Sequence, residues 1–351
     1  MILAYIYDRQ KNIIWQIFNV FAFECTIKLN DISTWELTIM NENMDDIMNI
    51  LKENNRIKVM ENTDGIENTL IEGYIRGIEA TLKNTVIKIE DYLSFLDDKM
   101  LYTAINFTGQ VDVLLQTILD QINAREDTGL LLDCSVTDTI TKQYAKWDSF
   151  FSVLKDLREN NYEFIVKDWT LFFKETIGID RSLVNNDYRE FMRDVNSPLD
   201  RTIRDAKMIM DVKQMCNCCI GKDGSNYGAY EDADSITEFW RVERSFTNNW
   251  NIQKATQNYV LERKDSIREF DISPNVTDFF YCDLGDIVRV YINSWNDLMF
   301  YDGTLKVIEK SYTAGEMWKV TFKLSKNKVK VQELNEKLKE INTRLKTLEL
   351  K

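Results

Sequence analysis

Short runs that alternate apolar and polar residues, at both ends of the chain, limit the possible folds more than any other feature. Alternation with period two places all apolar side chains on one face of a β-strand. Gly-containing turns such as Thr63-Asp64-Gly65 and Asp302-Gly303 lie between such runs. The pattern therefore predicts a small β-barrel-like domain at each end of the chain, over residues 1–100 and 271–325. The apolar positions of the clearest runs are Trp35, Leu37 and Ile39, and Trp318, Val320, Phe322 and Leu324.

Residues 101–180 follow a different pattern, typical of an α+β module. The apolar residues of 111–122 recur at helical spacing, and those from Trp147 to Leu157 repeat that spacing. Two short strands are then predicted, over 162–166 and 171–173. Residues 181–270 are expected to form a connecting α+β region with a long hairpin at 221–234. Helix is expected within 235–265, with Ala255, Tyr259 and Leu261 near a packing face.

Two apolar segments near the start need separate interpretation. Met44, Ile47, Met48 and Leu51 have helical spacing, so a short helix is expected to interrupt the first group of strands. The stretch from Ile13 to Phe23 is too short to cross a bilayer, which takes about 20 residues. It is interpreted as buried strands, and no membrane span is predicted.

The last 26 residues contain a heptad repeat. Apolar residues are separated by 3, 4, 3, 4 and 3 positions, with polar residues between them and no Gly or Pro. A helix with so narrow an apolar stripe gains little stability alone, so a parallel coiled coil between copies over 326–351 is favoured. Docking of this helix onto its own domain is the alternative. The predicted oligomerisation residues are Val331, Leu334, Leu338, Ile341, Leu345 and Leu348.

These segments together predict an α+β fold that is mainly β. Two small β-barrel-like domains are separated by an α+β module, and a C-terminal coiled-coil helix follows them. The 351 residues are enough for two or three domains of ordinary size.

The absence of histidine restricts the chemistry available to the chain. Histidine is the usual general base near neutral pH and the commonest metal ligand. Ser-His-Asp, Cys-His and His-based zinc or iron sites are therefore excluded. We expect no catalytic residues, no cofactor and a chain that is not an enzyme.

The net charge of −13 argues against a surface that grips nucleic acid, which needs clustered Lys and Arg. An acidic wall past which DNA slides is compatible with this charge, and so is acidic charge that only keeps the protein soluble.

Cys216, Cys218 and Cys219 are the only cysteine cluster in the chain. A tetrahedral zinc site usually needs a second ligand pair, and neither CxxC nor histidine supplies one here. The cluster is therefore interpreted as a strand with small, partly buried thiols, and no metal is predicted.

Two functions of other classes remain open from composition alone. A carboxylate-only glycoside hydrolase, acting on cell wall, needs two carboxyl groups roughly 5–10 Å apart in a cleft. Asp232, Glu238 and Glu243 are possible candidates, although no spacing selects them. A generic carbohydrate-binding β module is allowed by the abundant aromatic residues, although most of these occupy core-like alternating positions.

The order of the segments resembles the central hub proteins of long-tailed bacteriophage tails, whose fold is shared with contractile-tail baseplate hubs. Each motif alone is weak, and their order over residues 1 to about 325 carries the resemblance. The similar stretches are Tyr5-Ile6-Tyr7-Asp8 with Trp35 to Ile39, Glu72 to Glu79 with Tyr92 to Leu96, Leu154 to Leu157 with Tyr162 to Phe164 and Leu171 to Phe173, and Leu284-Gly285-Asp286 with Leu305 to Glu309.

The resemblance implies a homotrimer in which two similar barrels per chain form a ring around the DNA exit channel. It implies distal tail or tail-tube proteins, the tape-measure protein, and tip or receptor-binding fibre proteins as partners. DNA would pass without specific binding. The chain would be made in the bacterial host cytoplasm and reside in the virion, at the tail tip or baseplate. Only the heptad segment follows the last barrel, so receptor binding or wall digestion by this chain is not expected.

Overall fold

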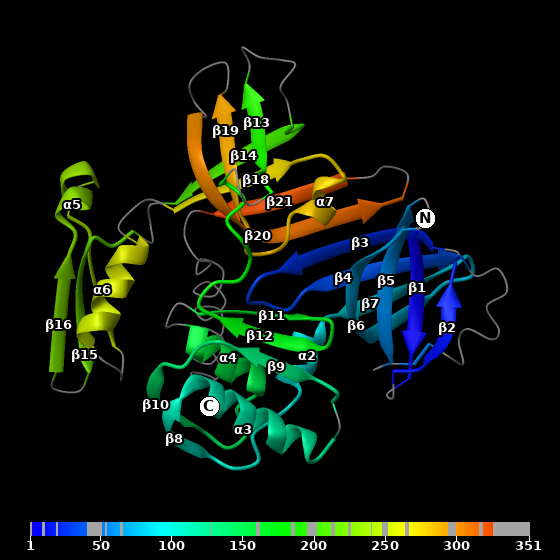
Figure 1. The fold of residues 1–351 in the computed structure, drawn as a ribbon, viewed down its shortest axis with the longest axis horizontal. Coiled ribbons are helices and arrows are strands. Elements are labelled where there is room, and N and C mark those ends of the chain that lie inside the picture. Colours follow the sequence, from blue (N-terminus) through cyan, green and yellow to red (C-terminus); the bar gives the residue numbers. More distant parts are fainter. Residues whose placement is uncertain are drawn as a thin grey trace, which may run out of the picture.

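The computed structural model (Figure 1) is mainly β, with helices gathered in two places. The structure describes residues 2–8, 11–18, 20–40, 51–52, 55–63, 66–126, 128–158, 162–183, 187–194, 202–211, 215–223, 226–239, 241–247, 252–263, 267–293, 300–315 and 319–325.

Thirteen strands form one large sheet, whose hydrogen-bonded order is β14-β18-β21-β20-β3-β4-β7-β6-β5-β1-β2, with β19 on β20 and β13 on β19. We call β1–β7 the N-terminal half and the other six strands the C-terminal half. The N-terminal strands are β1 (Ile2–Tyr7), β2 (Ile13–Ile17), β3 (Val20–Lys28), β4 (Thr34–Met40), β5 (Arg56–Thr63), β6 (Ile66–Ala80) and β7 (Asn84–Glu90). The C-terminal strands are β13 (Glu190–Asp194), β14 (Asp205–Asp211), β18 (Ile267–Ser273), β19 (Ile287–Asn293), β20 (Phe300–Ala314) and β21 (Lys319–Ser325).

The strands follow the alternation in the sequence. In β4, Trp35, Leu37 and Ile39 are at most 4% exposed, while Glu36 faces solvent. In β21, Val320 and its alternate neighbours are buried in the same way. The strand predictions at both ends are therefore confirmed, except at Trp318, which lies outside the described residues. The predicted helix around Met44 to Met48 lies outside them as well.

The two halves are not separate barrels, because β3 and β20 pair directly. Their antiparallel register joins Cys25 to Tyr312 and Thr26 to Ser311. Residues far apart in the sequence thus share one apolar core that contains side chains of both halves. Within the described residues the strand pairing closes neither half into a ring, so the two small barrel-like domains expected from the sequence are instead two parts of one sheet.

The α+β module packs below the sheet in Figure 1 and has a core of its own. The buried stripe of α3 confirms the predicted helix over 111–122, but Trp147 is not part of the next helix. It precedes α4 with a φ of 79° and is 59% exposed. The elements are α2 (Tyr92–Asp97), β8 (Ile105–Gln110), α3 (Val111–Asn123), β9 (Leu131–Cys134), β10 (Thr139–Tyr144), α4 (Phe150–Arg158), β11 (Glu163–Lys167) and β12 (Thr170–Lys174).

A small α+β unit stands apart at the left of Figure 1. Its hairpin of β15 (Cys218–Asp223) and β16 (Asn226–Glu231) matches the predicted hairpin, and β17 (Glu243–Thr247) pairs with β15. Its helices are α5 (Ala233–Phe239) and α6 (Ile252–Arg263). Val260 of α6 lies in the buried core and Tyr259 packs against it, whereas Leu261 is 44% exposed, so the predicted packing face is confirmed at Tyr259 and wrong at Leu261.

The apolar stretch from Ile13 to Phe23 forms strands, but it is not buried throughout. Ile17 and Phe23 are in the core, whereas Ile13, Phe18 and Phe21 are more than half exposed. The expectation of buried strands was therefore wrong for these positions. Ile13 belongs to β2 at the outer edge of the sheet, Phe18 lies between β2 and β3, and Phe21 stands at a register shift in β3. No helix in the described part of the chain is long and apolar enough to span a membrane.

Candidate functional site

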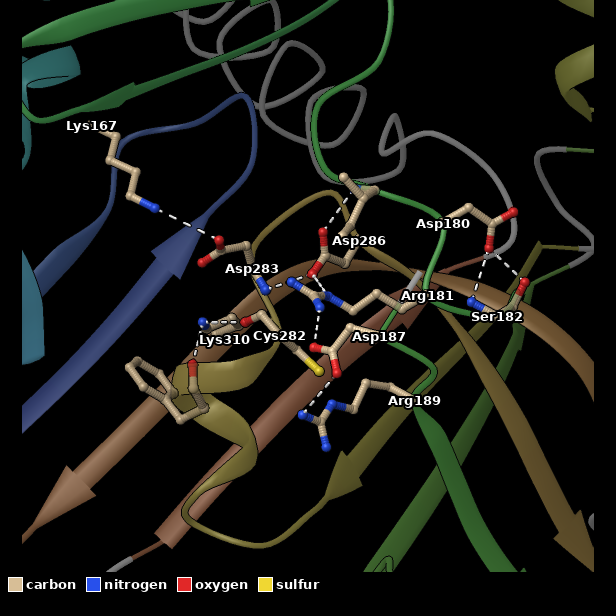
Figure 2. A network of polar contacts seen from close by, with 12 residues as sticks. Lys167, Asp180, Arg181, Ser182, Asp187, Arg189, Cys282, Asp283, Asp286 and Lys310 are labelled. Atoms are coloured by element: carbon tan, nitrogen blue, oxygen red, sulfur yellow. Dashed lines mark hydrogen bonds and ion pairs between the residues drawn. The ribbon is translucent and has the colours of Figure 1, made fainter. Parts of the chain in front are cut away.

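Buried polar contacts join the elements in the region where the halves and the module meet. Figure 2 shows its centre, where residues of β20, α7 (Asp278–Tyr281) and the segment before β13 converge. No enzyme-like constellation is evident there. The contacts instead hold elements together.

Asp286 organises the entry into β19. Its carboxylate accepts hydrogen bonds from Arg181 Nε at 2.6 Å and from the backbone amides of Ile179 and Asp283 at 2.9 Å each. The Asp286 side chain is 2% exposed, so its charge is balanced by these donors rather than by water. The Arg181 Nη1 atom also reaches Asp187 at 2.6 Å. These contacts fix the segment before β13 against the start of β19 (Figure 2).

Lys310 of β20 is buried at the seam of the two halves. Its ammonium group donates to the carbonyl oxygens of Phe279 and Cys282, both at 2.5 Å, at the end of α7. It also lies 4.3 Å from the centre of the Phe279 ring. Burial lowers the pKa of Lys310, because water is removed from the charged form. The lysine therefore anchors α7 to the sheet beside the β3–β20 junction.

Two buried thiols flank this lysine. Burial raises the pKa values of Cys25 and Cys282 to about 12 each, which keeps both thiols protonated near neutral pH. A protonated thiol is a weak nucleophile, so these cysteines act as small apolar residues.

The α+β module is fastened to both halves of the sheet. Lys306 Nζ of β20 donates hydrogen bonds to both carboxylate oxygens of Glu163 in β11, each at 2.7 Å. Asn30, in the turn after β3, exchanges two hydrogen bonds with the Phe164 backbone, at 3.1 and 2.6 Å. These contacts fix the position of the module relative to the joined sheet.

The outer face of the joined sheet carries a row of alternating charges across four strands. Asp271, Lys323, Glu309 and Lys28 are cross-strand neighbours on β18, β21, β20 and β3. Alternating signs on directly opposed residues stabilise a sheet by mutual attraction. Further along this face, charged side chains including Glu24, Glu36 and Glu90 line an open groove of about 620 Å³. The described residues of this face are polar across both halves.

The candidate carboxylates of the hydrolase alternative have other partners. Asp232 accepts a hydrogen bond from the amide of Ser235, at the start of α5, and Glu243 forms an ion pair with Arg241 at 2.6 Å. Nothing is described of the Glu238 side chain. Within the described residues no group of three or more Cys, Asp or Glu is arranged to hold a metal.

The cysteine cluster lies in the small unit. Cys216 and Cys219 are fully buried with Val260, and Cys218 is 7% exposed. Arg241 Nη2 lies 3.0 Å from the Cys218 sulfur, and Cys216 lies 3.2 Å from the Cys218 carbonyl oxygen. The thiols thus pack as a small core. Cys218 and Cys219 begin β15, as the interpretation as strand residues expects, whereas Cys216 precedes that strand.

The predicted oligomerisation residues, Val331 to Leu348, all lie outside the described residues, so the coiled coil stays a prediction. The sequence reasoning did not single out Arg181, Glu163, Lys306 or Lys310. For Glu163, Lys306 and Lys310 the signal is a charged residue at or beside a core-like position of an alternating strand, such as Glu163 beside Phe164, whereas Arg181 lies outside the strands.

The sequence matches no protein-family model and no curated protein. Solved structures are similar over nearly the whole chain. The prophage tail protein gp18 from Listeria monocytogenes EGD-e has a TM-score of 0.65 at 13% identity, covering 97% of this chain and 99% of its own.

Two further structures widen the comparison. The 43 kDa tail protein of prophage MuSo2 from Shewanella oneidensis has a TM-score of 0.64 at 11% identity, covering 92% of this chain and 97% of its own. An E. coli type VI secretion component, described as structurally similar to the T4 tail proteins gp27 and gp5, has a TM-score of 0.52 at 10% identity, covering 87% of this chain and 73% of its own. The chain therefore has the fold of the phage tail and baseplate hub proteins that its segment order resembles.

Proposed function

We propose that this chain is a structural virion protein, the trimeric central hub of a phage or phage-like tail tip or baseplate. It links the tail tube to tip or fibre proteins and surrounds the channel through which DNA leaves. It has no catalytic role. The observation that carries the proposal is the similarity to prophage tail proteins over nearly the full length of both chains.

The contacts at the junction support a load-transmitting part rather than an enzyme. The β3–β20 pairing makes one sheet from both halves, and Glu163 and Asn30 hold the module to it. A hub must keep its geometry while its neighbours exert force on it, and a continuous sheet with buried polar links resists relative motion of its parts.

The charge of the chain supports a channel that DNA passes without sticking. A net charge of −13 repels phosphate, and specific DNA binding needs clustered cations. The proposed partners are the distal tail or tail-tube proteins, the tape-measure protein and tip or fibre proteins. The coil over 326–351 would tie three copies together below the ring.

The first test is the solution mass of the purified chain, measured by light scattering at several concentrations. The proposal predicts a mass near three times the 41.4 kDa of one chain. A monomer that stays monomeric when mixed with its distal tail protein would contradict the trimeric hub. Hydrolysis of purified peptidoglycan, lost in a Glu238→Gln variant, would contradict the absence of a catalytic role.

A further inference from the structure

Three buried polar atoms that lack a hydrogen-bond partner come together where the N-terminal half meets the α+β module. They are Arg56 Nη1 of β5, Glu72 Oε2 of β6 and the hydroxyl oxygen of Tyr92 in α2. Among the described residues, seven buried side-chain nitrogen or oxygen atoms have no such partner, so three in one place form a cluster. A buried polar group that stays unpaired destabilises the native state, so this cluster indicates a group that pairs with it.

The register of β5 and β6 brings these side chains to one face of the sheet. Arg56 and Lys58 of β5 are the cross-strand partners of Tyr74 and Glu72 of β6. Residues two apart on a strand point to the same face, so all four side chains leave the sheet on one side. That side faces the module, because Tyr74 belongs to the module core. The Tyr92 ring stands edge-on to the Tyr74 ring, with the ring centres 5.0 Å apart.

Trp169, in the turn between β11 and β12, closes the site from the module side. Its ring centre lies 4.2 Å from the Arg56 guanidinium carbon and 4.6 Å from the centre of the Tyr92 ring. Arg56 Nη2 donates to the carbonyl oxygen of Thr128 at 2.8 Å, which holds the guanidinium in place. Arg56 and Tyr92 are 4% and 1% exposed, and the Glu72 side chain is 9% exposed. The site is therefore enclosed between sheet and module.

Tyr92 and Glu72 are close to each other without a direct hydrogen bond. The pKa of the Tyr92 hydroxyl is raised by burial and, after burial, by the negative charge of Glu72, so the carboxylate lies near the hydroxyl. One Glu72 oxygen pairs with Lys58 Nζ at 2.7 Å, whereas the other oxygen and the Tyr92 hydroxyl have no partner. The distance between these two atoms therefore exceeds a hydrogen-bond length, and a bridging group is needed to pair both.

The three atoms define the chemistry of this bridging group. Arg56 Nη1 can only donate a hydrogen bond, the Glu72 carboxylate can only accept one, and the Tyr92 hydroxyl can do either. The bridging group must therefore both accept and donate. The positive charges of Arg56 and Lys58 would repel a cation, and the charge of Glu72 would repel an anion, so the group is neutral. Water meets these requirements, and a buried water typically makes about three hydrogen bonds to otherwise unpaired polar groups.

We propose that one water molecule is bound between Arg56, Glu72 and Tyr92 as a fixed part of the native structure. It accepts hydrogen bonds from Arg56 Nη1 and from the Tyr92 hydroxyl, and it donates one to Glu72 Oε2. Arg56 and Glu72 belong to the sheet and Tyr92 belongs to α2, so the water joins the module to the N-terminal half. Its binding satisfies three groups at once, which offsets the entropy lost by holding one water.

The test combines a crystal structure of the full chain with urea unfolding of the Tyr92→Phe variant. We expect an ordered water within about 3.2 Å of all three atoms. Tyr92→Phe removes only the hydroxyl, so loss of its bond to the water should raise the unfolding equilibrium constant about fivefold. A hydroxyl that had no partner would give the opposite sign, because its removal would relieve an unpaired group. Tyr144→Phe is the matched control, since the Tyr144 hydroxyl bonds directly to Asp156 at 2.9 Å.

A double variant shows whether Tyr92 and Glu72 share the water. The two side chains have no direct hydrogen bond, so coupling between them reports the bridging group. In a Glu72→Gln background, we expect the effect of Tyr92→Phe on the unfolding equilibrium constant to be at least about threefold smaller. Independent effects of the two substitutions would overturn the shared water.

Two further results would overturn the proposal. One is a Tyr92→Phe variant that is as stable as the wild type or more stable. The other is a wild-type crystal structure that places the Tyr92 hydroxyl directly on Glu72, or that has no ordered water between the three atoms. The crystal structure needs no variant, so it decides the question even where a variant fails to fold. None of these results bears on the proposed hub function.

Discussion

Glu163 and Lys306 form a two-pronged ion pair, with both carboxylate oxygens 2.7 Å from the lysine nitrogen, between β11 of the module and β20 of the sheet. The side chains are 1% and 11% exposed, so little water screens the pair. Glu163 also accepts the amide of Ile177 at 2.7 Å, which extends the link to the segment entering the C-terminal half.

Removing one charge of this pair should destabilise the protein strongly. Glu163→Gln leaves Lys306 charged and poorly hydrated, and breaking a buried pair costs about 3 kcal/mol or more. The double variant Glu163→Gln/Lys306→Met should recover part of the loss, because no unpaired charge remains. Urea unfolding of both single variants and the double variant measures the coupling. If the stability lost by the double variant equals the sum of the stabilities lost by the two single variants, the two side chains act independently.

Gly285→Ala should destabilise the fold. Gly285 has a φ of 89°, and an added Cβ would lie 2.2 Å from the carbonyl oxygen of Ile177. Both the backbone strain and the clash act in the native state, so we expect a loss of at least about 2 kcal/mol in urea unfolding. Gly77→Ala is the control, because the nearest atoms to its added Cβ are 3.7 Å away. Equal losses in the two variants would refute this account.

Two adjacent residues in the β11–β12 turn should respond oppositely to glycine. Asp168 and Trp169 have φ angles of 48° and 61°, which glycine adopts without strain. Asp168 is exposed, so Asp168→Gly should raise the free energy of unfolding by up to about 1 kcal/mol. The Trp169 ring centre lies 4.2 Å from the Arg56 guanidinium carbon and 4.6 Å from the centre of the Tyr92 ring. Trp169→Gly removes these contacts and should lower the free energy of unfolding by about 2 kcal/mol or more. Thermal unfolding compares the two variants with the wild type. A change in stability of the same sign in both variants would contradict the role of Trp169.

Asp91 should make stability fall as pH rises. Burial raises the pKa of Asp91 to about 7, although its carboxylate accepts the amides of Ser33 and Leu93. The native state therefore holds a proton that the unfolded chain loses nearer pH 4. Stability from this group is complete below that pH and is lost as pH rises through about 7. The slope is at most about 1.4 kcal/mol per pH unit.

The Asp91→Asn variant should remove this slope. Urea unfolding from pH 4 to 8 should show the wild-type stability falling relative to the variant across the window. A constant difference between the two proteins would show that Asp91 does not titrate there.

Charged residues placed at the apolar a and d positions of the heptad repeat test the predicted coiled coil. Leu338→Asp with Ile341→Asp places carboxylates at neighbouring a and d positions, which should weaken association between copies. Analytical ultracentrifugation should show more monomer than in the wild type at equal concentration. Glu336→Asp, outside the seam, is the control. An unchanged oligomer would show that the ring contacts alone hold the assembly.

The sequence determined the local structure well, because strand and helix periodicities are properties of a few neighbouring residues. The alternation of Trp35, Leu37 and Ile39 predicted the buried face of β4, and the stripe from Val111 to Ile122 predicted α3. The order of such segments was also enough to indicate the fold of the tail hub proteins.

Only the tertiary structure decided how these pieces combine. Nothing local tells that Cys25 pairs with Tyr312, almost three hundred residues away, or that this pairing merges two expected barrels into one sheet. The same limit applies to Ile13 and Phe18, whose apolar character predicted burial although β2 lies at an open edge. Burial and ion pairing depend on which distant residues arrive at a position, and the pairs Glu163–Lys306 and Arg181–Asp286 exist only because the folded chain brings them together.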